Sequence, residues 1–311
     1  MSAHLNSEDP VRLGHKARTL SPDEVKKLTE DRELVSEFKQ NKLELEAKKH
    51  WDKFYLRNET RFFKDRHWTT REFEELLGLY WEPGHTGNGS APADKSRPVL
   101  LEVVACDFSP RAVALLAANP TFVAQGGRAF VCDLTTPMLF EEMRPNSVDV
   151  ATMIFMLSAV HPDKMPLVIS NIFKVVRPGG VVLFRDYGLY DQAQLRFKKG
   201  HKLQENFYVR QDGTRAFYFS EEATRGLFEK AGFSTKENSY VCRSTVNRKE
   251  NIDVPRVFVQ GKFVKPFEQA GALVNTLGSA DAPGEEREMR SSDLTSVAVS
   301  ASSSIESTLD S

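Results

Sequence analysis

Cysteine is scarce in this chain, with Cys106, Cys132 and Cys242 the only three among 311 residues. They are widely separated and form no Cys-x-x-Cys pair, which argues against both a disulfide framework and a zinc site. The seven histidines show no metal-ligand spacing either. We therefore expect no metal and a reducing compartment: a cytoplasmic protein, with a nuclear pool as the alternative.

Long apolar runs are also missing. No run approaches the ~20 residues of a membrane span, and the N-terminus lacks the apolar core of a signal peptide, so we expect no membrane contact. The formal net charge is only −1. Residues 268–311 contain eight acidic and two basic residues, which leaves residues 1–267 with an excess of five positive charges. This mild excess is compatible with nucleic-acid binding without requiring it.

Composition divides the chain into five parts. Residues 1–20 have no periodicity and are predicted to be disordered. Residues 21–82 form a helical, basic and aromatic extension. It begins with a helix N-cap signal at Ser21, Pro22 and Glu24. Residues 83–98 are a linker rich in Gly, Pro and Ser. Residues 99–266 form the main domain, and residues 267–311 are predicted to be a disordered acidic, Ser-rich tail.

The main domain alternates apolar runs with helical patterns, which is typical of an α/β fold with a parallel sheet. Strands are predicted near 99–107, 128–132, 148–155 and 181–186. Helices are predicted near 110–118, 163–176 and 221–231. Two β-rich stretches, 239–247 and 255–264, are long enough to pair as a hairpin at the sheet edge.

The first strand region has an unusual spacing. Leu100–Val103 resembles a first strand ending in an acidic residue, and Ala105–Asp107 resembles a second strand ending in a ribose-binding carboxylate. In a βαβ unit these acidic residues lie about 20 residues apart, separated by a glycine-rich turn and a helix. Here Glu102 and Asp107 are five apart. The pattern predicts a Rossmann-like fold that lacks its first loop and helix.

Several predicted strand ends carry groups suited to an adenosyl cofactor. Asp107 could bind ribose hydroxyls, Asp133 and Leu134 could contact the adenine edge, and Ile154 could pack on the ring. Either carboxylate alone is better explained as a turn cap, but the ordered set favours a cofactor. The Pro-Gly-Gly turn at 177–180 and the terminal hairpin favour an S-adenosylmethionine-dependent methyltransferase over a nicotinamide-dependent reductase.

Two further stretches suggest substrate contacts. Residues 50–71 interleave aromatic and basic side chains, as an RNA-binding surface requires; alternatively, Trp51 and its aromatic neighbours form a core or pack over the cofactor. Residues 184–188 read Phe-Arg-Asp-Tyr-Gly at a strand end, where open α/β sheets bind ligands. There, Arg185 and Asp186 are either a structural ion pair or a substrate-binding carboxylate positioned by its neighbour.

Seven stretches occur in the order WDKFY, FFKDRHWTTREFEEL, ACDFSPRAV, CDLT, LSAVHPDKM, LFRDYGLYD and ENFYVRQDGTR. Together they resemble the tRNA 3-methylcytidine methyltransferases. The similarity covers about residues 16–266, apart from the 77–98 linker. The resemblance implies a seven-stranded methyltransferase fold with S-adenosylmethionine as donor. It also implies cofactor contacts at Trp51, Tyr55, Glu102, Asp107, Asp133, Leu134 and Ile154. The family's Glu-x-Gly-Cys-Gly-x-Gly loop has no counterpart after Glu102.

The same resemblance implies methylation of cytidine N3 in the anticodon loop of tRNA. N3 has an in-plane lone pair, so the site must supply orientation and an anion rather than a base. Asp186 is the catalytic candidate, acting on an unpaired, flipped base. RNA and substrate contacts are predicted at Phe63, Lys64, Arg66, His67, Arg185, Tyr187, Arg210, Asp212 and Arg215. Expected partners are tRNA and an aminoacyl-tRNA synthetase or other helper protein. The alternative is a non-catalytic variant that binds tRNA or a partner without the donor.

Overall fold

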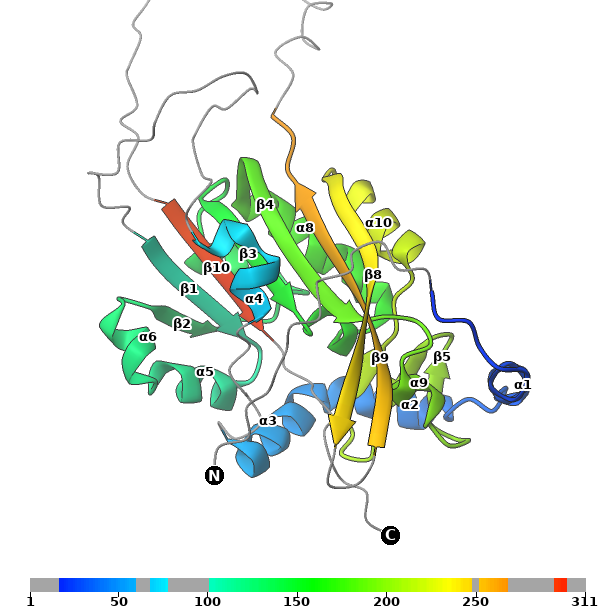
Figure 1. Cartoon of the computed structure of the whole chain (residues 1–311). Coiled ribbons are helices and arrows are strands. Elements are labelled where there is room, and N and C mark those ends of the chain that lie inside the picture. The colour runs from blue at the N-terminus through cyan, green and yellow to red at the C-terminus, as the bar shows by residue number, and fades with distance from the viewer. Residues whose placement is uncertain (1–16, 60–67, 78–100, 248–251, 268–293, 301–311) are drawn as a thin grey trace, which may run out of the picture.

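The computed structural model describes residues 17–59, 68–77, 101–247, 252–267 and 294–300. Its centre is a seven-stranded sheet with the strand order β2-β1-β10-β3-β4-β9-β8 (Figure 1). Five strands are mutually parallel: β2 (Arg128–Val131), β1 (Leu101–Asp107), β10 (Leu294–Ser300), β3 (Val148–Ile154) and β4 (Val176–Tyr187). The predicted seven-stranded, Rossmann-like α/β class is confirmed.

The edge of the sheet is the hairpin expected from the sequence. Strand β9 (Ile252–Val264) runs antiparallel to β4, and β8 (Ser234–Asn247) runs antiparallel to β9. The Pro-Gly-Gly segment lies within β4, where the pairing with β3 jumps from Val176 to Val181. Gly179 has a φ of 78° there, a conformation that glycine adopts without a steric penalty.

The strand predicted near 99–107 is confirmed as β1, and the two shorter stretches that resembled separate strands, 100–103 and 105–107, are joined within it. Residues 101–107 form one continuous strand, because nothing interrupts the pairing of β1 with β2 and β10. Glu102 therefore lies near the amino end of β1, about 17 Å along the strand from Asp107. Its side chain is exposed. The predicted contact of Glu102 with the cofactor is not supported by this position.

The C-terminal tail also differs from the prediction. Residues 294–300, within the stretch expected to be disordered, form the strand β10 between β1 and β3 (red in Figure 1). Composition indicated disorder because this stretch has few large apolar residues. Pairing of a strand on both sides depends on backbone hydrogen bonds, which composition does not report. The rest of the tail after residue 267 lies outside the described residues.

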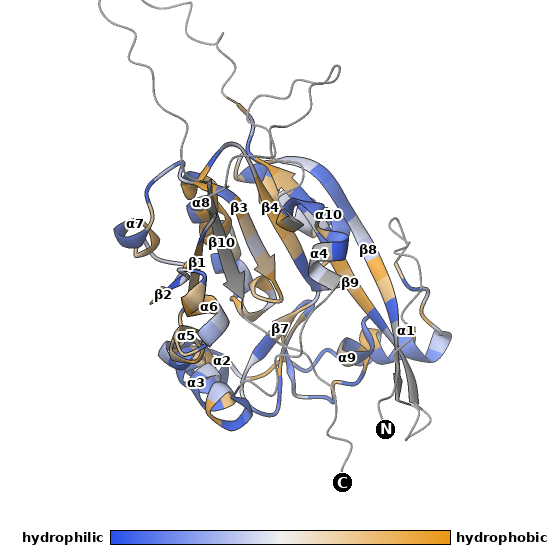
Figure 2. Cartoon of the chain, turned by 60° about the vertical axis from the view of Figure 1, so that its left-hand side comes forward, coloured by the Kyte–Doolittle hydropathy of each residue, from blue (hydrophilic) through white to orange (hydrophobic). Residues whose placement is uncertain are grey.

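Helices cover both faces of the sheet. On one face, α8 (Met165–Val175) and α10 (Glu221–Lys230) enclose the largest core cluster, which includes Phe184, Phe228 and Phe263. On the other face, α4 (Trp68–Glu72) and the 3-10 turn η1 (Glu74–Leu77) bring the fully buried Phe73 against β3 and β4. Figure 2 shows apolar residues gathered in these two strands, whereas α3 (Ala47–Asn58) is composed mainly of hydrophilic residues.

The N-terminal extension is helical as predicted. It contains α1 (Pro22–Glu30), α2 (Glu37–Leu45) and α3 (Ala47–Asn58). The expected capping box begins α1: Glu24 N donates to Ser21 Oγ at 3.3 Å, and Ser21 N donates to the Glu24 carboxylate at 2.9 Å. None of the helices in the described ranges is both long and apolar enough to cross a membrane.

The remaining elements frame the carboxyl end of the parallel strands. Helices α5 (Pro110–Ala117) and α6 (Pro120–Ala124) follow β1, and the 3-10 turns η2 (Leu157–Ala159) and η3 (Pro162–Lys164) follow β3. After β4 come α9 (Gln192–Leu195) and a small antiparallel sheet of β5 (Lys202–Gln204), β6 (Phe207–Val209) and β7 (Arg215–Phe217). This second sheet is not predictable from the sequence pattern, because each of its strands is only three residues long.

Candidate functional site

The carboxyl ends of the parallel strands bring most of the predicted cofactor residues to one edge of the sheet. Asp107 ends β1, Ile154 ends β3, and Asp133 follows β2 by two residues. The backbone amide of Cys132 donates to the Asp107 carbonyl at 3.0 Å, which fixes the turn after β2 against the end of β1. This edge is where open α/β sheets bind their ligands.

Asp107 is held by its own turn and by the N-terminal extension. The amide of Ser109 donates to Asp107 Oδ1 at 2.8 Å, and the Tyr55 hydroxyl donates to Oδ2 at 3.4 Å. Burial raises the pKa of Asp107 to about 7, and these two hydrogen bonds oppose that rise. The carboxylate can therefore gain from further donors, such as a pair of hydroxyl groups.

The aromatic residues of α3 cover this end of β1. Trp51, Phe54 and Tyr55 are buried together and pack against Phe108 and the side chains of α5. The ring centroids of Trp51 and Phe54 are 5.2 Å apart. Three interpretations of these aromatics were open: an RNA-binding surface, a core and a cover over the cofactor. The structure shows a buried cluster, as a core requires, and its tyrosine contacts Asp107. The roles toward RNA and cofactor stay predictions.

A second contact fastens α3 to the same turn. The Ser109 hydroxyl donates to the Asp52 carboxylate at 2.5 Å, and Ser109 Oγ also accepts from the amide of Ala112 at 3.2 Å, which caps α5. Asp52 was not among the predicted site residues. It lies between charged and aromatic neighbours in a helix, and nothing in the sequence alone distinguishes it from a solvated side chain.

Asp133 and Leu134 form the turn after β2. Asp133 Oδ1 accepts from the amide of Thr135 at 2.9 Å and from its hydroxyl at 2.7 Å. The Leu134 carbonyl accepts from the amide group of Asn171 on α8 at 2.9 Å. Asp133 thus serves as a turn cap through Oδ1.

Asp186, the catalytic candidate, is fully buried near the end of β4. Its Oδ2 accepts from the backbone amide of Ser158 at 2.9 Å, and its Oδ1 accepts from the amide of Tyr187 at 2.9 Å. Burial raises the pKa of Asp186 to about 6, opposed by these hydrogen bonds and by the charge of Arg210. Asp186 is therefore ionised at neutral pH. Ser158, in η2, was not predicted to contribute.

Arg210 points inward toward Asp186 and Tyr187. Its guanidinium carbon lies 5.6 Å from the centre of the Tyr187 ring, and Nη1 donates to the Arg215 carbonyl at 3.1 Å. Nε and Nη2 are buried and have no hydrogen-bond partner among the described residues. The Tyr218 hydroxyl is likewise buried without such a partner. Guanidinium nitrogens only donate, so this site offers two donors for an acceptor.

Arg185 lies on the opposite side of β4 from Asp186, because successive side chains of a strand alternate. Its guanidinium forms an ion pair with Glu72 of α4 and donates to Gln260 Oε1 at 3.1 Å. Glu72 also pairs with Arg243 at 2.5 Å. A substrate-binding role for Asp186 stays a prediction. Arg185 takes part in a structural ion pair whose partner is Glu72. It attaches α4 to the sheet, and Glu72 was not anticipated.

Asp212 lies in the turn between β6 and β7, and Arg215 is the first residue of β7. Arg215 is buried and forms an ion pair with Glu44 of α2. Asp212 Oδ1 accepts from the amide of Thr214 at 3.0 Å and from its hydroxyl at 2.7 Å. The predicted RNA contacts of these two residues are untested. Phe63, Lys64, Arg66 and His67 lie outside the described residues, so their predicted role also stays a prediction.

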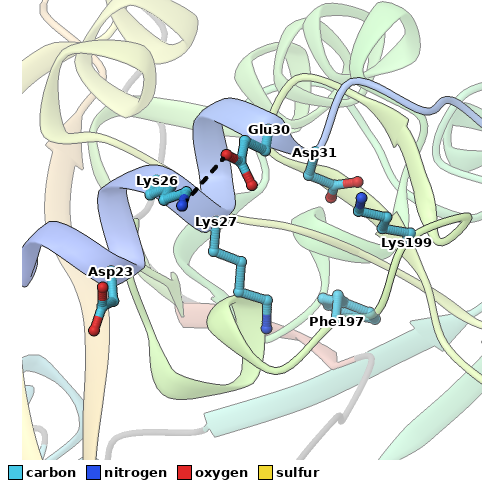
Figure 3. Close-up of a pocket in the computed structure, with 7 residues that line it drawn as sticks. All are labelled: Asp23, Lys26, Lys27, Glu30, Asp31, Phe197 and Lys199. Carbon is cyan, nitrogen blue, oxygen red and sulfur yellow. Dashed lines mark ion pairs between the residues drawn. The ribbon is translucent and has the colours of Figure 1, made fainter.

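A separate cavity of about 210 Å³ lies beside α1 (Figure 3). It is lined by Asp23, Lys26, Lys27, Glu30, Asp31, Phe197 and Lys199. Five of the six charged residues in this lining come from α1 or the residue after it, and none is a predicted site residue. The cavity is therefore distinct from the edge that carries Asp107 and Asp186.

This chain is similar to known methyltransferases. Residues 84–238 match a family described as a methyltransferase domain. A tRNA N(3)-cytidine methyltransferase METTL6 from Pongo abelii is 52% identical over 278 residues, covering 86% of this chain and 98% of that protein. The tRNA(Thr) (cytosine(32)-N(3))-methyltransferase of Saccharomyces cerevisiae is 36% identical over 274 residues, covering 84% of this chain and 43% of that protein.

One solved structure illustrates the more distant similarity. The Burkholderia thailandensis 1,6-didemethyltoxoflavin-N1-methyltransferase, with its substrate and S-adenosylhomocysteine bound, is 12% identical with a TM-score of 0.43. The match covers 85% of this chain and 99% of that chain.

Proposed function

This chain belongs to the tRNA N(3)-cytidine methyltransferase family, and from that premise we propose that it forms 3-methylcytidine in the anticodon loop of tRNA. It is an S-adenosylmethionine-dependent methyltransferase. The observation that carries the proposal is the 52% identity over 278 residues, which covers 86% of this chain and 98% of that relative.

The residues at the sheet edge fit the adenosyl half of the cofactor. Asp107 is a half-buried carboxylate with a raised pKa, and two ribose hydroxyls would favour its ionised form by donating to it. Ile154 would pack on the adenine, and Asp133 with Leu134 would contact its edge. Trp51 and Tyr55 would exclude water from the adenosyl site on the side that α3 covers. When bound, the cofactor supplies the electrophilic methyl group.

Asp186 and Arg210 complement the Watson–Crick edge of cytosine. That edge presents the N4 amine as a donor, then N3, then the O2 carbonyl as an acceptor. Asp186 can accept from the amine, and the buried nitrogens of Arg210 can donate to O2. Uracil has the acceptor O4 where cytosine has the N4 amine. It would therefore face the Asp186 carboxylate with an acceptor and could not donate to it. The pair therefore provides a basis for selecting cytosine.

The same pair suits the charge that develops during the reaction. Methylation of N3 leaves a positive charge on the base, and an ionised Asp186 beside the amine would stabilise it. Arg210 opposes that charge, but it would bind the uncharged ground state through O2. Its charge also adds to the hydrogen bonds from Ser158 and Tyr187 that lower the pKa of Asp186 against the effect of burial. No general base is required, because N3 carries no proton in neutral cytosine.

The partners follow from this assignment. N3 is occupied in a base pair, so tRNA would bind with the target base unpaired and flipped toward Asp186. Phe63, Lys64, Arg66 and His67 are proposed to contact the flanking RNA, and Tyr187 lies beside the proposed base site. An aminoacyl-tRNA synthetase or another helper is the proposed protein partner, and the cytoplasm is the proposed location.

Transfer of labelled methyl groups to total tRNA tests the proposal. We expect label in 3-methylcytidine, and a substrate tRNA whose target cytidine is replaced by uridine should accept none. Label in any other nucleoside, or in none, would overturn the assignment. The alternative of a non-catalytic tRNA-binding variant predicts tRNA binding without measurable S-adenosylhomocysteine binding in calorimetry. The observation that favours this alternative is the absence of the family's glycine-rich loop from this sequence.

A further inference from the structure

The central position of the sheet is filled from the C-terminus of the chain. In doubly wound sheets the strand order is 3-2-1-4-5-6, and the first strand of the fold lies in the centre, next to strand 4. The order β2-β1-β10-β3-β4 follows this arrangement, except that β10 takes the place of the first strand. The sequence thus lacks the family's glycine-rich segment after Glu102, and β10 occupies the position that the first strand has in such sheets.

Backbone pairing holds β10 on both sides. Residues 294–299 pair in parallel with residues 101–106 of β1, and residues 296–300 pair in parallel with residues 150–154 of β3. Strand β1 has no direct pairing with β3 among the described residues. Without β10, the sheet would separate into β2–β1 and β3–β4–β9–β8.

The course of the chain brings β10 to this slot easily. Val264, at the end of β9, pairs with Val181, so β9 finishes at the amino edge of the parallel strands, the edge at which β10 begins. The intervening residues 265–293 could span at most about 95 Å when extended. The slot lies three strands from β9, or about 14 Å. A segment of the same chain is therefore a suitable occupant.

This strand sets the width of the donor site. Cys106 pairs with Val299, and Ile154 pairs with Ser300, so Asp107 and Ile154 are separated by the width of β10. Two strand spacings place the backbones of β1 and β3 about 10 Å apart. If β1 paired directly with β3, Asp107 would move about 5 Å toward Ile154 and the space between the proposed ribose and adenine contacts would close.

We propose that residues 294–300 are a positioning strand that docks in the slot between β1 and β3 and holds Asp107 and Ile154 at the spacing required by the cofactor. The interaction resembles the addition of a strand to an exposed sheet edge, with the strand supplied by the same chain. The inference concerns the donor site and does not depend on which RNA the enzyme methylates.

Proline substitution tests the strand directly, because proline cannot donate a hydrogen bond in the middle of a sheet. The full-length Val297→Pro variant is compared with Ser302→Pro, a matched proline two residues beyond β10. Hydrogen–deuterium exchange is followed in residues 101–107 and in the β8–β9 hairpin, and S-adenosylhomocysteine affinity is measured by calorimetry. We expect Val297→Pro to remove protection in β1, leave the hairpin protected, and weaken binding at least tenfold, while Ser302→Pro matches the parent.

Unchanged protection of β1 together with unchanged affinity in Val297→Pro would overturn the proposal. If that variant loses protection everywhere, the milder Val297→Gly is used; loss confined to β1 supports the proposal, and uniform loss contradicts it. A concentration-dependent dimer whose β1 protection disappears on dilution would mean that a second copy supplies the strand, which also contradicts it. Methyl transfer to tRNA by the parent is measured in parallel, so failure of the proposed reaction is distinguishable from failure of the strand.

Discussion

Asp107 combines burial with charge in a way that couples cofactor binding to pH. Burial raises the pKa of its carboxyl to about 7, while the Ser109 amide and the Tyr55 hydroxyl favour the ionised form. Ribose hydroxyls must donate, so the ionised carboxylate is the state that binds. Protonation below pH 7 therefore competes with binding.

We expect the affinity for S-adenosylhomocysteine to fall by up to about tenfold per pH unit below pH 7. In Asp107→Asn, the loss of a hydrogen-bonded charge should weaken binding at pH 8 by about 10- to 100-fold, corresponding to about 1.5–3 kcal/mol. That variant should also lose the pH dependence. Calorimetry between pH 5.5 and 8 measures both effects.

The exposed Asp163, whose side chain is 80% accessible, provides the matched control. Asp163→Asn should bind like the parent at every pH. If Asp107→Asn retained the full pH slope, another group would be responsible for it.

Asp186 is expected to act on the base and not on the donor. Asp186→Asn keeps the shape of the side chain and removes its charge, so we expect methyl transfer to fall at least about 100-fold, within the range for removing one electrostatic stabiliser. Affinity for S-adenosylhomocysteine should stay within a few-fold. Single-turnover transfer and calorimetry measure the two quantities separately.

The pH profile gives a second test of the same residue. Burial raises the pKa of Asp186 to about 6, and the transfer rate should decline as pH falls below that value because the carboxylate becomes neutral. Equal losses of transfer and donor affinity in Asp186→Asn would indicate a structural role for its hydrogen bonds to Ser158 and Tyr187.

At the scale of elements, the short helix α4 depends on one buried carboxylate. Glu72 forms ion pairs with Arg185 of β4 and Arg243 of β8, and its side chain has no exposed area. Removing its charge removes the anion that these arginines share with Arg71. Breaking a buried pair in this way typically costs about 3–5 kcal/mol.

We expect Glu72→Gln to lower the free energy of unfolding by an amount in that range, measured by urea denaturation. Glu30→Gln is the matched control, because Glu30 is 58% exposed and lies 4.0 Å from Lys26. An exposed pair of this kind contributes about 0–1 kcal/mol. A similar small effect for both variants would show that α4 is held mainly by the packing of Phe73.

At the scale of the whole molecule, the two buried aspartates make stability depend on pH. Both have pKa values raised in the folded state, so the folded chain binds more protons than the unfolded chain at intermediate pH. The stability they contribute is greatest at low pH and is lost as pH rises through the folded values of about 6 and about 7. The ionised carboxylates that the proposed function requires are thus less favourable for the stability of the fold than the protonated ones at both positions.

We expect the double variant Asp107→Asn/Asp186→Asn to gain stability over the parent as pH rises from 4.5 to 7.5. The difference between the two proteins is measured by thermal unfolding, so contributions from other groups largely cancel. A constant difference across this range would contradict the raised pKa values. The same excess of S-adenosylhomocysteine should stabilise the parent more than the double variant, because the stabilisation increases with the logarithm of the ligand concentration divided by its Kd.

Local patterns were sufficient for much of the fold and part of the site. The alternation of apolar runs predicted β2, β3, β4 and the β8–β9 hairpin, and the cap residues at Ser21 predicted the start of α1. Acidic residues at strand ends predicted that Asp107 and Asp133 meet at one edge, because parallel strands share that edge. These features depend on residues close together in the chain, where periodicity and capping chemistry act directly.

Long-range pairing decided the rest. The sequence by itself determined an α/β methyltransferase with Asp107 and Asp186 at strand ends. Only the tertiary structure placed Glu102 far from the site, paired Arg185 with Glu72, turned Arg210 toward Asp186, and inserted residues 294–300 between β1 and β3. The physical reason is that a strand is stabilised by partners distant in sequence, through backbone groups that every residue carries, so local composition does not identify its neighbours.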